Sequence, residues 1–117
     1  MRTKGFLKNG AAIVAMGSLL ALTAASAQAD DAKQAYEKNC VSCHGAGGKG
    51  DGPAAKMLKP APKDFAEALK GAKDADIAKV IKEGGKAVGK APLMPAYGSK
   101  LSDDQIQAVV QYIKGLK

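Results

Sequence analysis

Apolar side chains recur every three or four residues in four stretches of the chain, a spacing typical of helices with one buried face. The last stretch is the longest, and its continuous apolar stripe consists of Ile106, Val109, Val110 and Ile113. Ser102 and Gln105 form a capping box ahead of it, with Leu101 at a staple position. The pattern therefore predicts a long C-terminal helix.

Three shorter helices are predicted upstream of it. The first leads into Cys40, Asp31 is placed to cap its start, and one face carries Ala32, Ala35, Tyr36 and Asn39. The second covers residues 64–70, with Asp64 as the N-cap, and the third covers residues 74–83, with two glycines as the stop. No stretch alternates apolar and polar residues in the manner of a strand, so we expect an all-α fold.

The N-terminus has the pattern of an export signal. Basic residues at positions 2, 4 and 8 precede an almost continuous apolar run over residues 11–27, and Ala27-Gln28-Ala29 is an A-x-A cleavage pattern. A membrane anchor is the alternative, but the run is short, rich in Ala and interrupted by Ser18 and Thr23. We expect residues 1–29 to be a cleaved secretory signal peptide and residues 30–117 to be one periplasmic domain without a membrane span.

Cys40, Cys43 and His44 form a C-x-x-C-H motif, the attachment site of c-type haem. Two thiols one helical turn apart can add to the two vinyl groups of a porphyrin, and the next imidazole can bind its iron. A structural zinc site needs four ligands, whereas these are the only Cys and His residues of the chain. A thioredoxin-like pair would lie beside a βαβ pattern, and a lone disulfide would leave the adjacent His without a role. The motif predicts one covalent haem c with His44 as an iron ligand.

Met94 is the best candidate for the second axial ligand, because haem proteins that carry electrons commonly pair His with Met. It lies in a loop over residues 91–98, where flanking prolines stiffen the backbone. Met57 is the other candidate, but we expect it to stay on the His44 side of the porphyrin as a flexible packing residue.

The domain over residues 30–117 resembles the class I c-type cytochromes, in particular the small soluble bacterial monohaem electron carriers. The resemblance rests on the helix that enters the C-x-x-C-H motif, on Gly52-Pro53, on Met94-Pro95 and on the C-terminal helix with Tyr112. It implies a cytochrome c-like fold of about four helices around one haem. It also implies that the Pro53 carbonyl accepts the His44 imidazole N–H, a bond that would orient the ring.

The same resemblance implies that the first and last helices cross at small and aromatic residues, which here are Ala32, Tyr36 and Tyr112. Tyr97 follows Met94 by three residues, and we expect it to pack beside the ligand or to reach a haem propionate. An ordinary place on the loop surface is the alternative for this side chain.

Charge and composition fit this interpretation. The chain of 117 residues has 18 Lys plus Arg against 11 Asp plus Glu, and only 4% of it is aromatic. A porphyrin would supply the missing core of so small a domain. The domain's basic residues are all Lys, which argues against nucleic-acid binding. A subset in the loops can form a positive rim that attracts an acidic redox partner, or can simply add solubility: Lys49, Lys56, Lys59, Lys86, Lys90 and Lys100.

We therefore expect a monomeric one-electron carrier that exchanges electrons with redox proteins and is not itself an enzyme. Two alternatives remain open. One is a haem sensor that binds a gas or another ligand at an open sixth iron position. The other is a haem subunit of a larger oxidase or dehydrogenase complex.

Overall fold

The computed structural model describes residues 17–116, with side chains from residue 24 onward, and this part of the chain contains helices and no strand. The α-helices are α1 (Gly17–Asn39), α2 (Val41–His44), α3 (Phe65–Ala68), α4 (Asp74–Glu83) and α5 (Asp103–Lys114). Two short 3-10 helices, η1 (Ala55–Met57) and η2 (Lys86–Val88), lie in the long loops. The predicted all-α fold is confirmed, with the helix at the motif split into α1 and α2.

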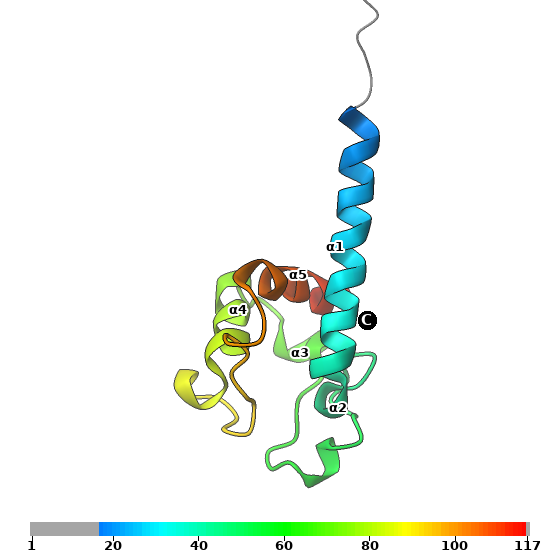
Figure 1. Cartoon of the computed structure of the whole chain (residues 1–117). Coiled ribbons are helices and arrows are strands. Elements are labelled where there is room, and N and C mark those ends of the chain that lie inside the picture. The colour runs from blue at the N-terminus through cyan, green and yellow to red at the C-terminus, as the bar shows by residue number, and fades with distance from the viewer. Residues whose placement is uncertain (1–16, 117) are drawn as a thin grey trace, which may run out of the picture.

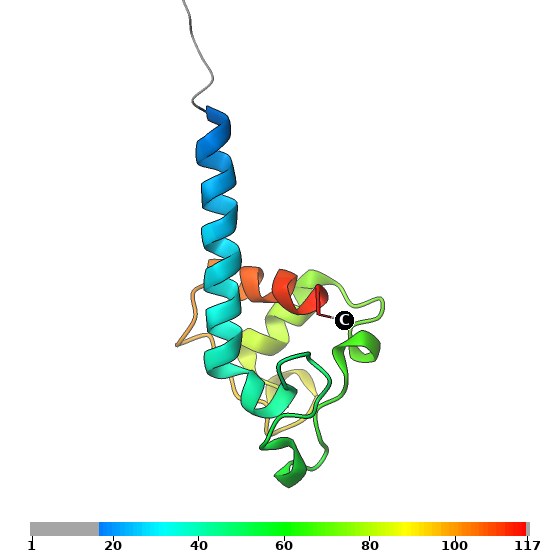
Figure 2. The ribbon, with the colours of Figure 1, turned by 90° about the vertical axis from the view of Figure 1, so that its right-hand side faces the viewer.

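The helix α1 is longer than the sequence pattern predicted. It runs through Asp31, so the expected N-cap at this residue is wrong. The preceding segment is rich in Ala, the residue with the highest helix propensity, and contains nothing that would stop a helix. Its N-terminal part stands away from the other helices (Figures 1 and 2), and residues 24–31 are exposed.

The predicted cleavage point after Ala29 falls inside α1, whereas the basic start of the predicted signal peptide lies outside the described residues. Among residues 17–116, no helix combines the length and the hydropathy that a membrane span requires.

The C-terminal half of α1 crosses α5, as predicted. Ala32 and Tyr36 are buried at the crossing, and the rings of Tyr36 and Tyr112 lie 5.3 Å apart in a tilted arrangement. The Tyr36 hydroxyl donates to the carbonyl of Gly45 at 2.6 Å, so this residue also anchors the chain just after α2. The pKa of the Tyr36 hydroxyl is raised to about 12, and burial is the largest cause of this shift. The hydroxyl therefore keeps its proton.

The core lies where α4 packs beside α5. The apolar stripe of α5 is buried as predicted, and the capping box of Ser102 and Gln105 is present with both of its hydrogen bonds. Ion pairs join the two helices at both ends, because Asp74 accepts from Lys114 and Lys82 donates to Asp103 at 2.7 Å. The loop with η2 contacts α4, whereas the loop with η1 contacts α2.

Candidate haem site

A cavity of about 630 Å³ separates α2 and the loop after it from the segment that carries Met94. Its volume falls within the range of about 300–1,000 Å³ that is typical of cofactor sites. A smaller pocket of about 70 Å³ adjoins it, and six residues line both: Cys40, His44, Pro60, Pro62, Ala91 and Met94. Most of the remaining wall is apolar, which suits the flat face of a porphyrin.

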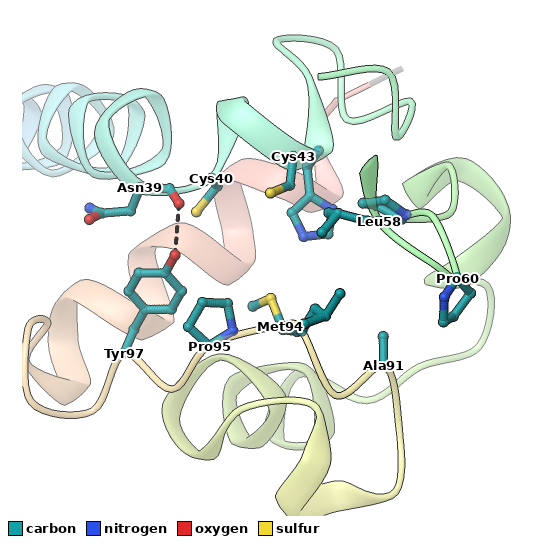
Figure 3. A pocket seen from close by; sticks show the side chains of 12 residues that line it. Asn39, Cys40, Cys43, Leu58, Pro60, Ala91, Met94, Pro95 and Tyr97 are labelled. Carbon is teal, nitrogen blue, oxygen red and sulfur yellow. Dashed lines mark hydrogen bonds between the residues drawn. The ribbon is translucent and has the colours of Figure 1, made fainter. Parts of the chain in front are cut away.

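Both cysteines are free thiols, and their sulfur atoms point into this space from the α2 side (Figure 3). Cys40 is the N-cap of α2 and Cys43 lies within it, so one turn of helix separates the two thiols. Burial, with a smaller contribution from Cys43, raises the pKa of the Cys40 thiol to about 11. The Cys40 thiol is therefore protonated at neutral pH.

His44 ends α2 and lines both pockets beside the thiols. Its ring stacks on Phe65, with the centroids 4.7 Å apart and the planes at 22°. Burial lowers the pKa of His44, which favours the neutral imidazole that binds metals. Phe65 is a contact that the sequence did not indicate, because only its place on a predicted helix face was visible.

The Nδ1 atom of His44 is buried and has no hydrogen-bond partner. No hydrogen bond joins this Nδ1 atom to the Pro53 carbonyl, and the role of Pro53 stays a prediction. The position of Gly52 requires a residue without a side chain. A Cβ atom at this position would collide with the carbonyl oxygens of Val41 and Ser42, so only glycine lets the loop pass this close to α2.

Met94 faces the cysteines across the cavity, and its sulfur points toward them (Figure 3). Met57 lies in η1, is 79% exposed and lines neither pocket, so its expected role as a packing residue is wrong. The η1 turn leaves this side chain at the surface, where few neighbours surround it. Of the two candidate ligands, only Met94 lies where its sulfur could reach an iron held between the cavity walls.

Glycines at the end of α4 allow the Met94 segment to pass close to the backbone there. The backbone N–H of Gly85 donates to the Met94 carbonyl at 2.9 Å, and a Cβ atom on Gly85 would collide with the Ala91 carbonyl. From the sequence, Gly84 and Gly85 were predicted only to end a helix. Their second function, the close approach of two backbone segments, depends on contacts between residues distant in sequence.

Tyr97 is half-buried and lines the smaller pocket, so the alternative of an ordinary surface side chain is wrong. Its hydroxyl donates to the carbonyl of Asn39 at 2.9 Å, as the dashed line in Figure 3 shows. Burial raises the pKa of Tyr97, which keeps this donor protonated. A contact with a propionate stays a prediction.

The six loop lysines are all exposed. Lys90 lines the large cavity, and the Lys100 ammonium group lies 5.8 Å from the centre of the Tyr97 ring. Leu93 is 56% exposed and lines the smaller pocket, so an apolar spot lies at the mouth of the site.

These residues fit haem c. Two thiols stand side by side, and a neutral imidazole with an unpartnered buried nitrogen lies next to them. A thioether faces the thiols across the smaller apolar pocket, which adjoins the large cavity. Thiol, imidazole and thioether are the groups that bind haem and its iron in c-type cytochromes.

Comparison with known proteins agrees with this geometry. Residues 27–113 match the family model described as cytochrome c oxidase, cbb3-type, subunit III. Cytochrome c6 of Microcystis aeruginosa is 36% identical over 83 residues, which cover 71% of this chain and 90% of that protein. Cytochrome c6 of Tetradesmus obliquus is 33% identical over 81 residues, which cover 69% and 82%. The cbb3-type cytochrome c oxidase subunit CcoP of Azospirillum brasilense is 28% identical over 91 residues, 78% of this chain but 29% of that subunit.

The family model covers most of the chain, and the two cytochromes c6 match it over most of their own length. The chain therefore belongs to the family described as cytochrome c oxidase, cbb3-type, subunit III, among the small class I c-type cytochromes, and it is a monohaem electron carrier with covalently bound haem c.

Proposed function

We propose that the protein is an exported one-electron carrier in which His44 and Met94 are the axial iron ligands and Cys40 and Cys43 bind the porphyrin. One observation carries this proposal: Cys40, Cys43 and Met94 line the same apolar pocket, with the two thiols facing the Met94 sulfur across it (Figure 3). Met57, the competing ligand, is exposed and lies outside that cavity.

Haem c supplies an iron that alternates between the ferrous and ferric states. Cys40 and Cys43 would hold the porphyrin through two thioether bonds, one from each sulfur to a former vinyl group. His44 contributes a neutral imidazole, and the Met94 thioether favours ferrous iron and so raises the reduction potential. The largely apolar wall would shield the bound group from water. The protein transfers electrons without an enzymatic activity of its own.

The visible spectrum of the ferric protein tests the ligand assignment. The wild type and Met57→Ala should both show the weak red band of charge transfer between a Met sulfur and iron. Met94→Ala should lose this band, and its reduced form should bind carbon monoxide. The Met57 variant is the matched control, because it removes the same side chain from an exposed position.

Two results would contradict the assignment. A Met94→Ala protein with a Met-type spectrum would move the ligand elsewhere. A wild type that lacks the band and binds carbon monoxide would instead indicate a ligand-binding sensor with an open iron position.

The exposed loop lysines support docking of an acidic redox partner near the cavity mouth. Lys90→Glu, at the cavity, should slow electron transfer to an anionic small redox reagent at low salt and speed it to a cationic one. Lys79→Glu on α4 is the matched control, because it makes the same charge change at an exposed helix position that lines neither pocket. Equal effects of the two variants on the electron-transfer rates would contradict docking at the cavity and would indicate that the lysines serve solubility.

The basic start, the apolar run and the A-x-A pattern support export to the periplasm. The mass of the protein from a periplasmic extract should correspond to a chain that begins at Asp30. A mass that includes residues 1–29 would contradict cleavage.

A second candidate function is that of a haem subunit in a terminal oxidase complex. The matched family model and the relative CcoP favour it, although the chain spans only 29% of the length of CcoP. Size-exclusion chromatography of detergent extracts, followed at the haem absorbance, separates the two functions. Elution with a large oxidase supports the subunit, and elution as a free monomer supports the mobile carrier.

A further inference from the structure

One hydrogen bond joins the two walls of the haem site. The Tyr97 hydroxyl donates to the Asn39 carbonyl at 2.9 Å, although 58 positions separate the two residues in sequence. Asn39 is the last residue of α1 and directly precedes Cys40, whereas Tyr97 follows Met94 by three residues. The bond therefore ties the wall that carries the thiols to the wall that carries the thioether (Figure 3).

The backbone of Tyr97 is held more firmly than that of Met94. Its N–H donates to the Ile81 carbonyl on α4 at 2.9 Å, and its own carbonyl accepts from Lys100 and Leu101, both at 2.9 Å. Met94 has one backbone bond inside its own loop, to the Ala91 carbonyl at 3.1 Å, and one to Gly85. The Met94 segment is thus suspended between Gly85 and Tyr97, and the Tyr97 side chain is its link to α1.

We propose that Tyr97 is a positioning residue whose hydroxyl holds the Met94 segment against the end of α1 and so limits displacement of the Met94 thioether by competing ligands. This inference rests on the proposed role of Met94 as an axial ligand. For another ligand to reach the iron, the Met94 segment must move away from the opposite wall. An opening that carries Tyr97 along with Met94 breaks the bond to Asn39 and leaves a helix-terminal carbonyl without that partner.

Tyr36 provides a control that separates this role from ordinary stabilisation. Its hydroxyl also donates to a backbone carbonyl, that of Gly45 at 2.6 Å, but it does so on the His44 side of the site. Tyr36 is 1% exposed, so its bond is the more deeply buried of the two. Tyr97→Phe and Tyr36→Phe each remove one hydroxyl and keep the ring.

The test is a titration of the ferric haem-loaded protein with imidazole, followed by loss of the red Met-to-iron band. Tyr97→Phe should raise the apparent affinity for imidazole about fivefold, the change expected from one lost hydrogen bond of ordinary strength. The rate of displacement at saturating imidazole, which is limited by release of Met94, should rise as well. Tyr36→Phe should leave both quantities within about twofold of the wild type, while it lowers the Tm at least as much as Tyr97→Phe.

Two outcomes would overturn the inference. One is an imidazole affinity and a displacement rate in Tyr97→Phe equal to those of the wild type. The other is an equal rise in both tyrosine variants, which would mean that general destabilisation controls ligand exchange. A wild type without the red band would instead refute the proposed Met94 ligation itself, so the two failures are distinguishable.

Discussion

Substitution of both cysteines by alanine, Cys40→Ala with Cys43→Ala, prevents covalent attachment and tests how far the fold depends on haem. The cavity that haem would fill has a volume of about 630 Å³. At about 24 cal/mol per Å³, an empty cavity of this size costs about 15 kcal/mol. This is an upper value, because solvent and rearranged side chains can fill part of the space. Small domains are stable by only about 5–15 kcal/mol, so we expect the haem-free chain to be unfolded.

Far-ultraviolet circular dichroism and thermal melting measure this dependence. The double variant should lose most of the helical signal of the haem-loaded wild type and show no cooperative transition. Ser42→Ala is the matched control, because it changes an exposed residue between the two cysteines and leaves both thiols in place. A double variant with the helical signal of the wild type and a cooperative transition would refute the reasoning, since the chain would then supply its own core.

Three further predictions concern packing, backbone approach and pH. Ile106→Ala, at a position 2% exposed, should lower the free energy of unfolding by about 2–5 kcal/mol in denaturant titrations, whereas Gln107→Ala on the exposed face of α5 should have little effect. Gly52→Ala should cost about 1–3 kcal/mol, because its Cβ meets two backbone carbonyl oxygens of α2, and Gly47→Ala, whose Cβ meets only the flexible Lys49 side chain, should be tolerated. Hydrogen bonds from Lys114 and then Gln111 lower the pKa of Asp74 below its usual 3.8, so its stabilising contribution is complete above pH 3.8 and is lost as the pH falls through the lowered value. Asp74→Asn should remove this part of the acid dependence of unfolding, and an unchanged acid limb would refute it.

Local signals in the sequence predicted most helix boundaries well. The residues of α4 and the capping box of α5 are where the pattern placed them, because caps and apolar spacing act over a few neighbouring residues. The start of α1 was missed for the same kind of reason. Asp31 has the chemistry of a cap, but the Ala-rich segment before it is also helical. The high helix propensity of this segment extends the helix upstream, because no residue there interrupts it.

In the candidate site, too, some residues could be identified from the sequence and others only from the structure. Cys40, Cys43 and His44 are neighbours in sequence, and the chemistry of haem attachment requires that order, so the motif identified them directly. The choice between Met94 and Met57 depended on which residue the loops bring to the cavity. Exposure of one and the cavity position of the other became visible only in three dimensions.

By itself, the sequence determined that this is an all-α chain with one C-x-x-C-H haem site, because both features are written in residues a few positions apart. Only the tertiary structure decided that Phe65 stacks on His44, that Gly85 admits the Met94 segment and that Tyr97 bonds to Asn39. The two residues of each contact are far apart in sequence: Gly85 and Met94 are separated by 9 positions, and Asn39 and Tyr97 by 58. Periodicity and motif spacing carry no information about which distant segments meet, whereas packing of the loops against α4 and the end of α1 brings them together.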